Sequence, residues 1–174
     1  MFDWNIEWAI VTGISSIVIA SLAFFLTVYQ TKQTNKHNRL TVKPHLQTWN
    51  TITKTTCSVF LLNNGLGPAF INSIDYYLDK KKLESKENEP VDVILGSIFN
   101  GYIEDPYTTA RFASNNVIKA GDKVTLVEFC IKDNYPHDQY PIADIIGDRT
   151  DIVVKYKSIY EEDFTLDSRE TGML

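Results

Sequence analysis

The chain has 174 residues, of which 44% are hydrophobic and 22% charged, close to the proportions of globular proteins. This length allows one domain of ordinary size, and the composition excludes wholesale disorder. The formal net charge is −5, but from Pro44 onward 13 Lys or Arg stand against 20 Asp or Glu, a difference of −7. Such an acidic region disfavours nucleic-acid binding, because that affinity depends on neutralising phosphates.

An uncharged stretch at residues 10–29, IVTGISSIVIASLAFFLTVY, predicts a transmembrane helix. About 20 apolar residues in a helix cross the roughly 30 Å of bilayer hydrocarbon. Trp4, Trp8 and Tyr29 lie at its two ends, where amphipathic rings favour the membrane interface. The alternatives are a buried core helix and a cleaved signal peptide. The latter is disfavoured because the preceding residues contain Asp3 and Glu7 but no Lys or Arg.

Basic residues follow this stretch and none precedes it, which predicts the orientation of the helix. By the positive-inside rule, residues 1–9 form a short external tail and the C-terminal side lies in the cytoplasm. The stalk at residues 30–43 carries the side chains expected to contact anionic lipid headgroups, at about 1 kcal/mol each. These are Lys32, Lys36, Arg39 and Lys43. We therefore expect a single-pass signal-anchor protein.

Small residues recur along the predicted helix at alternating spacings of four and three. A heptad stripe of this kind keeps one helix face turned toward a partner helix. Close packing and hydroxyl hydrogen bonds then drive association in lipid. The stripe is Ala9, Gly13, Ser16, Ala20, Ala23 and Thr27. It predicts a homo-oligomer, although chance is the alternative because such residues are common in membrane helices.

Residues 44–174 are predicted to form a mainly antiparallel β-sandwich with one or two short helices. Runs rich in β-branched and aromatic residues alternate with turns and with a charged hairpin tip or loop at 79–89. The strand-like runs are 45–49, 57–62, 69–79, 122–132, 150–160 and 164–166. Apolar residues at helical spacing predict a helix over 90–99, which begins at Pro90, and 141–147 predicts a second. No strand–helix–strand rhythm is present, which favours an antiparallel sheet.

The segment NNGLGPA at 63–69 predicts a tight turn between two of these strands. Gly65 and Gly67 are expected to supply positive φ, and Asn63 and Asn64 to bond their own backbone. The functional alternative is an anion-binding nest of free N–H groups. That signal is weak, because no helix follows and the Lys and Ser/Thr of a P-loop are absent.

Four stretches together resemble a group of uncharacterised bacterial single-pass membrane proteins with a cytoplasmic immunoglobulin-like sandwich. They are the juxtamembrane HNRLTVKPHL at 37–46, NNGLGPA at 63–69, IKAGDKVTL at 118–126 and VKYKSIYEEDF at 154–164. The resemblance covers nearly the whole chain. It implies an immunoglobulin-like fold and an anchor in the bacterial inner membrane, and it implies no catalytic residues.

The sequence contains no catalytic or metal-binding constellation. His37, His45 and His137 have no second ligand at metal-binding spacing. Cys57 and Cys130 are expected to be buried, reduced thiols, because the inferred compartment is reducing and both lie in apolar strands. A catalytic pair of cysteine and histidine would require a strand and a loop to converge by chance. We predict no enzymatic activity and no cofactor.

The recognition residues predicted from the sequence lie in two loops. One is the turn with Asn63, Asn64, Gly65 and Gly67, and the other contains Tyr102, Tyr107 and Arg111. Tyr and Arg are enriched at binding hot spots, although core packing explains the tyrosines equally well. The predicted function is a membrane-anchored module that recognises a protein or a ligand. The alternative, by analogy of fold alone, is an oligomeric membrane effector of a bacterial antiviral defence system.

Overall fold

The computed structural model describes residues 4–84, 89–110, 116–136 and 141–171. It divides after Thr41 into two compact units, Met1–Thr41 and Val42–Leu174. The first contains a helix and the second contains two antiparallel sheets, which confirms the predicted helix followed by a β-sandwich.

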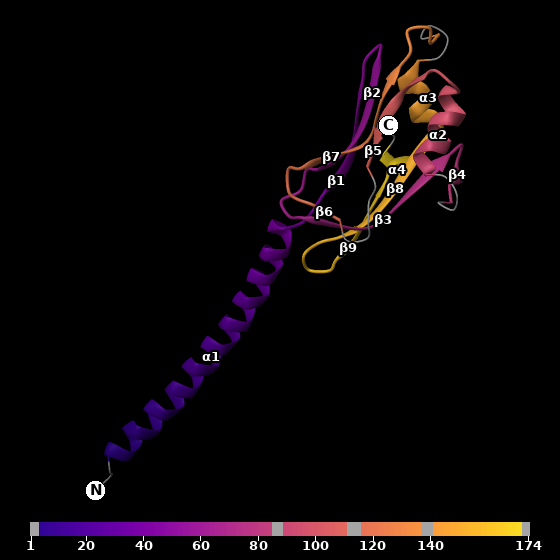
Figure 1. The fold of residues 1–174 in the computed structure, drawn as a ribbon. Helices are drawn as coiled ribbons and strands as arrows, with labels where there is room; N and C mark the ends of the chain where they lie inside the picture. The colour runs from indigo at the N-terminus through magenta and orange to yellow at the C-terminus, as the bar shows by residue number, and fades with distance from the viewer. Residues whose placement is uncertain (1–3, 85–88, 111–115, 137–140, 172–174) are drawn as a thin grey trace. The chain divides into compact units, whose positions relative to one another are not determined.

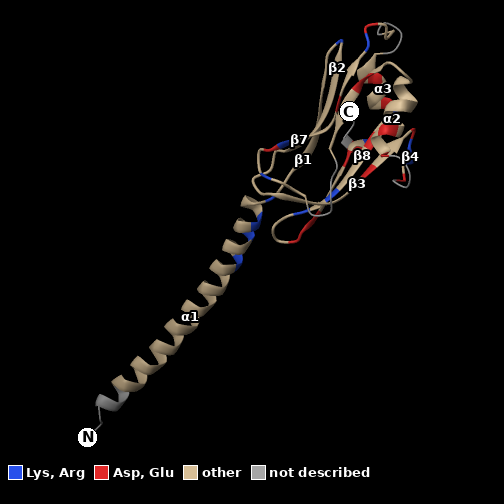
Figure 2. Cartoon of the chain, in the orientation of Figure 1, with Lys and Arg blue, Asp and Glu red and all other residues tan. Residues whose placement is uncertain are grey.

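The first unit is the helix α1 (Trp4–Thr41). From Trp8 it is long and apolar enough to cross a membrane, with a mean hydropathy of 2.3 over its most apolar window. The hydroxyls of Ser16, Ser21 and Thr27 each donate to the carbonyl four residues earlier at 2.8 Å. These polar atoms are therefore satisfied within the helix. Figure 2 shows that the basic residues of α1 are confined to its C-terminal part.

The second unit consists of two sheets packed face to face (Figure 1). The first sheet has the strand order β1 (Leu46–Ile52), β2 (Thr56–Asn63), β7 (Lys123–Ile131) and β5 (Ile103–Thr109). The second has the order β4 (Lys81–Lys82), β3 (Ala69–Leu78), β8 (Thr150–Lys157) and β9 (Asp163–Asp167), and β6 (Val117–Ile118) also pairs with β3. Leu61 and Leu126 of the first sheet pack with Ile71 and Val154 of the second in the buried core.

Helices α2 (Pro90–Phe99) and α3 (Ile142–Arg149) lie where the sequence predicts them, whereas the short α4 (Ser168–Thr171) was not expected. Pro90 occupies the first turn of α2, where its missing N–H needs no partner. The apolar face of α2 buries Val91, Leu95 and Phe99, and α3 adds Ile142 and Ile146 to the same core. Both helices therefore belong to the hydrophobic core of the sandwich.

The two cysteines differ, and the prediction that both are buried is wrong for Cys130. Both thiols are free, with Cys57 buried on β2 and Cys130 exposed on β7. A bulge explains the difference. Val59 pairs with Val127 but Phe60 pairs with Thr125, so one residue of β7 has no opposite partner. Beyond the bulge the odd-numbered residues of β7 face the core, and Cys130 points outward.

Candidate functional site

Asn63, at the end of β2, is completely buried, and both the oxygen and the nitrogen of its side-chain amide form hydrogen bonds within the domain. Its Oδ1 accepts hydrogen bonds from the N–H groups of His45 at 3.2 Å and Gly65 at 3.0 Å. Its Nδ2 donates to the carbonyls of Gly67 at 2.9 Å and Ile118 at 3.0 Å. Asn63 therefore links three separate segments of the domain, which is a structural role.

The glycines of this turn are required for close packing, which corrects the expectation of positive φ. Neither Gly65 nor Gly67 adopts a φ in the left-handed region. A Cβ on Gly67 would lie 1.8 Å from the carbonyl oxygen of Val42, and one on Gly65 would lie 2.3 Å from the backbone nitrogen of His45. The turn at 63–68 thus closes on the segment Val42–His45, and we call these two segments together the entry clasp.

Backbone N–H groups of the turn already donate hydrogen bonds to carbonyl groups of the domain, which argues against an anion nest. Asn64 donates its N–H to the carbonyl of His45 at 2.8 Å, and Leu66 donates to that of Lys43 at 3.1 Å. The Asn64 side chain, in contrast with that of Asn63, is exposed and donates to Gln47 Oε1 at 2.9 Å. The predicted recognition turn is therefore one half of the entry clasp.

The second predicted recognition loop is largely a strand. Tyr102 packs edge-on against Tyr135 at 5.4 Å between ring centroids, at the margin of the core. Tyr107 lies on β5 and donates its hydroxyl to Asp92 Oδ1 of α2 at 2.6 Å. This hydrogen bond raises the pKa of Tyr107 to about 12. Arg111 lies outside the described residues.

The remaining sequence predictions concern α1 and the stalk. Every residue of the small-residue stripe is exposed on α1, as are Lys32, Lys36 and Arg39. Lys43 belongs to the second unit, where its Nζ lies 5.3 Å from the centre of the Phe164 ring.

Among the described residues, no three His, Cys, Asp or Glu side chains gather as a metal site. Burial raises the pKa of the Cys57 thiol to about 12, which keeps it protonated and unreactive, and His137 lies outside the described residues.

A small apolar cavity of about 50 Å³ lies inside the domain beneath α2. Its walls include Val59, Ile94, Phe129 and Ile146. Tyr76 also lines it, and burial, with a smaller contribution from the charge of Glu89, raises the pKa of this tyrosine to about 12. Pockets for organic ligands usually enclose about 300–1,000 Å³. This cavity is therefore too small to be the ligand site of a recognition module.

The strand β1 forms an edge of the first sheet. At its first residue, the Leu46 N–H already donates to the hydroxyl of Tyr156 at 3.4 Å. The seven residues of β1, LQTWNTI, contain no charge and no proline. They pair with β2 in an unbroken register from Leu46 to Ile52. Natural sheets normally protect such edges with charges, prolines, bulges or very short strands. An edge of this kind favours the addition of another strand.

The other edge strands among the described residues are protected. In β5, Pro106 and the acidic Glu104 and Asp105 accompany a break in the register with β7. In β9, Asp163 and Asp167 occupy the two ends of a five-residue strand. Strand β4 has two residues, both lysines. Within the described part of the chain, β1 is thus the long edge strand without charge.

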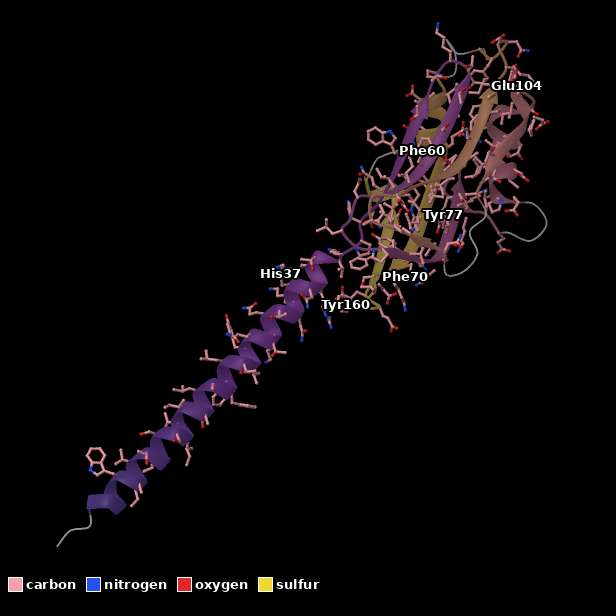
Figure 3. The ribbon with its side chains drawn as sticks, turned by 60° about the vertical axis from the view of Figure 1, so that its left-hand side comes forward. His37, Phe60, Phe70, Tyr77, Glu104 and Tyr160 are labelled. Carbon is pink, nitrogen blue, oxygen red and sulfur yellow. The ribbon has the colours of Figure 1, made fainter. Side chains whose placement is uncertain are left out.

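The outer face beside this edge carries exposed aromatic surface. The side chain of Trp49 is 60% exposed. It lies directly opposite Phe60 of β2, which Figure 3 labels on that strand. Lys123 of β7 places its Nζ 4.3 Å from the centre of the Phe60 ring. Because Trp is enriched at binding hot spots, the β1 edge with Trp49 is the best candidate for an interaction surface.

Sequence reasoning missed Trp49, because an edge strand can be recognised only once the strand order is known. The absence of charge in LQTWNTI was the one signal present. Comparisons with protein-family models and with curated proteins found no match to this chain.

Proposed function

We propose that this chain is a membrane-anchored recognition module that binds a protein partner by strand addition at the β1 edge. The uncharged edge with the exposed Trp49 is the observation that carries the proposal. In strand addition, main-chain hydrogen bonds supply affinity and neighbouring side chains supply specificity. No enzymatic step is part of this function.

The anchor in this proposal is α1, which crosses the bacterial inner membrane with its N-terminus outside and the sandwich in the cytoplasm. Its length and apolarity support a membrane span, and Lys32, Lys36 and Arg39 near its C-terminal end support this orientation. A C-terminal fusion to alkaline phosphatase should be inactive, whereas a fusion to a fluorescent protein that matures only in the cytoplasm should fluoresce. The opposite pattern would overturn the orientation.

The recognition step is tested by photo-cross-linking of the full-length chain in its own membranes. A photoreactive amino acid at Trp49 should give discrete adducts of higher mass. The matched control is Thr165, an exposed position on the protected edge strand β9, which should give none. Equal adducts at the two positions, or none at Trp49, would contradict recognition at the β1 edge.

The second candidate function is an oligomeric membrane effector, which the small-residue stripe on α1 favours. Small residues on one helix face let two backbones approach closely in lipid, and their hydroxyls can bond across the helices. Gly13→Ile and Ala20→Ile should lower self-association in a bilayer reporter assay, and Ile14→Leu should not. If all three variants associate like the parent, the stripe has no role in assembly.

A further inference from the structure

We propose that one end of the sandwich docks on the lipid bilayer that anchors α1, by inserting Leu66, Ile159 and Tyr160 into the headgroup layer. This inference rests on the anchor in the proposed function and does not depend on recognition at the β1 edge. It follows from the strand order, from the exposed apolar side chains of the loops and from the charge of those loops.

The strand pairing brings four connecting segments to the end of the domain where the chain enters it. The turn at the end of β2 closes on the entering segment in the entry clasp. The turn before β7 lies beside it, because Gly121 donates its N–H to the carbonyl of Asn63 at 2.9 Å. The start of β3 pairs with the end of β8, so the hairpin between β8 and β9 lies at this end too, where Figure 3 labels Tyr160. We call the segments 42–45, 63–68, 119–122 and 158–162 together the entry end.

Exposed apolar side chains of the sandwich gather at the entry end. Among the described residues outside α1, the large apolar side chains that are exposed, apart from Trp49, are Leu66, Val117, Ile159 and Tyr160. Leu66 is 73% exposed and the other three are 44–56% exposed. Val117 adjoins the entry end, because β6 pairs with the start of β3. Exposed apolar groups that cluster in this way mark contact sites for membranes or proteins.

Two of these turns have a fixed backbone that leaves the apolar side chains uncovered. Leu66 lies between two glycines that pack against the entering segment, and its N–H donates to the carbonyl of Lys43. In the hairpin, the buried Ser158 accepts hydrogen bonds at its Oγ from the N–H groups of Tyr160 at 3.2 Å and Glu162 at 3.3 Å. Polar residues and glycine are usual in such turns. Apolar side chains on preformed turns can bind with little further ordering of the chain.

The connection to α1 keeps the entry end close to the bilayer. The uncharged part of α1 from Trp8 to Thr31 has 24 residues, about 36 Å of helix, which covers the roughly 30 Å of hydrocarbon. The ten residues 32–41 add about 15 Å, and the headgroup layer takes up about 5–8 Å of this. The domain therefore begins within about 10 Å of the headgroups. A tilt of the domain at the junction between Thr41 and Val42 can cover that distance.

Charge also favours the entry end as the face that approaches the bilayer. The domain from Pro44 onward has a net charge of −7, whereas 117–123 and 157–163 contribute three lysines and four acids, a difference of −1. Lys43 brings the entry end to neutrality, so the remaining −6 lies elsewhere in the domain. An anionic bilayer repels those other surfaces and repels the entry end least. Tyrosine is moreover enriched at the level of the headgroups.

The test measures lipid contact of the purified full-length chain in nanodiscs of phosphatidylethanolamine and phosphatidylglycerol. Cys130→Ser removes the exposed native thiol, and the buried Cys57 is retained. Ile159→Cys then carries the fluorophore NBD, and the matched control is Thr55→Cys, an exposed position in the turn at the opposite end of β1. A nitroxide on the acyl chains just below the headgroups should quench the label at 159 at least about three-fold more strongly, because interfacial side chains reach about 5–10 Å into this layer.

A second pair of variants separates insertion from mere proximity to the bilayer. Leu66→Glu and Tyr160→Glu, added together to the Ile159→Cys chain, should lower the quenching to the level of the control, because carboxylates resist transfer out of water. Both positions are exposed, so the fold should persist. Thr55→Glu and Thr108→Glu add the same charge at exposed positions elsewhere and should leave the quenching unchanged.

Equal quenching of the two labels, or quenching at 159 that survives Leu66→Glu and Tyr160→Glu, would overturn the docking. Discrete protein adducts from a photoreactive residue at Ile159 in native membranes, without quenching in nanodiscs, would show that a protein covers the entry end and would overturn it as well. Absence of quenching in a chain whose C-terminal fusions give the predicted orientation would remove the docking alone, and the anchor would stand. Fusions that show no membrane span would overturn both.

Discussion

The two halves of the first sheet are built in opposite ways. In the half formed by β1 and β2, the register is regular, one buried asparagine fixes the end of the strand, and the outer edge has no charge. In the half formed by β7 and β5, one register break changes which residues of β7 face the core, and a second interrupts the pairing of β5 with β7. The edge strand of this half contains a proline and two acids. The comparison indicates that charge and proline protect the edge of the irregular half, whereas the edge strand of the regular half has neither.

The largest expected difference between the halves is the reactivity of their cysteines. Burial raises the pKa of Cys57 from 9.0 to about 12, which lowers its thiolate fraction about 1,000-fold near neutral pH. Cys130 is exposed. In the native full-length chain at pH 8, a maleimide should therefore modify Cys130 at least about 100-fold faster than Cys57, as followed by mass spectrometry of the digested protein. Equal rates would contradict the change of face at the bulge.

The neighbouring asparagines at the end of β2 provide the next contrast. Asn63→Ala removes four hydrogen bonds of a buried side chain and should lower the free energy of unfolding by about 3–5 kcal/mol. Asn64→Ala loses one bond of an exposed side chain and should cost about 0.5 kcal/mol or less. Urea unfolding of the detergent-solubilised chain, followed by tryptophan fluorescence, measures both. Similar losses in the two variants would mean that the entry clasp does not depend on Asn63.

Two glycine-to-alanine substitutions compare a position in the entry clasp, where a side chain would clash, with a position on α2, where it would not. Gly67→Ala should lower the free energy of unfolding by about 3 kcal/mol, since its Cβ would overlap the Val42 carbonyl. Gly96→Ala should raise it by about 0.5–1 kcal/mol, because Gly96 lies within α2 with no atom within 4 Å of the new Cβ. The same unfolding experiment reports both changes. A neutral Gly67→Ala variant would remove the physical reason for glycine in this turn.

The smallest effect is expected at β5, where Tyr107 is held to α2 at the surface. Tyr107→Phe removes one partly exposed hydrogen bond and should cost about 1 kcal/mol or less. The bond raises the pKa of this tyrosine from 10.0 to about 12, so its contribution is complete below about pH 10 and is lost as the pH rises toward 12. Stability of the parent and the variant should therefore converge over that interval. A constant difference from pH 8 to pH 12 would contradict a role for the hydroxyl.

The same comparison explains which parts of the fold were predictable. Strand β2 and helix α2 follow from local patterns, because each keeps one periodicity from end to end. Burial of Cys130 was predicted wrongly because the bulge in β7 depends on its pairing with β2, far away in the sequence. Strand β5 was predicted as a loop because Pro106 and two acids are typical of loops.

The candidate site was even less accessible from the sequence. The asparagines and glycines of the NNGLGPA turn attract attention as a motif, but their atoms are used to hold Val42–His45. Trp49 lies in a run that is merely β-prone, and its importance comes from the strand order, which places β1 at an edge. Edges are a property of the whole topology, so no local pattern identifies them.

The pairing of β3 with β8 also determines when the domain can fold during synthesis. The end of β3 at Leu78 and the start of β8 at Thr150 are neighbours in the sheet, yet about 70 residues separate them in the chain. Ribosomes add about 5–20 residues per second, so β8 is synthesised about 4–14 seconds after β3. Until then only the two-residue strands β4 and β6 can pair with it, and the apolar side chains of Ile71 and Ile74 remain uncovered. The sandwich therefore stays incomplete for several seconds of synthesis, and it can fold only after β8 has been made.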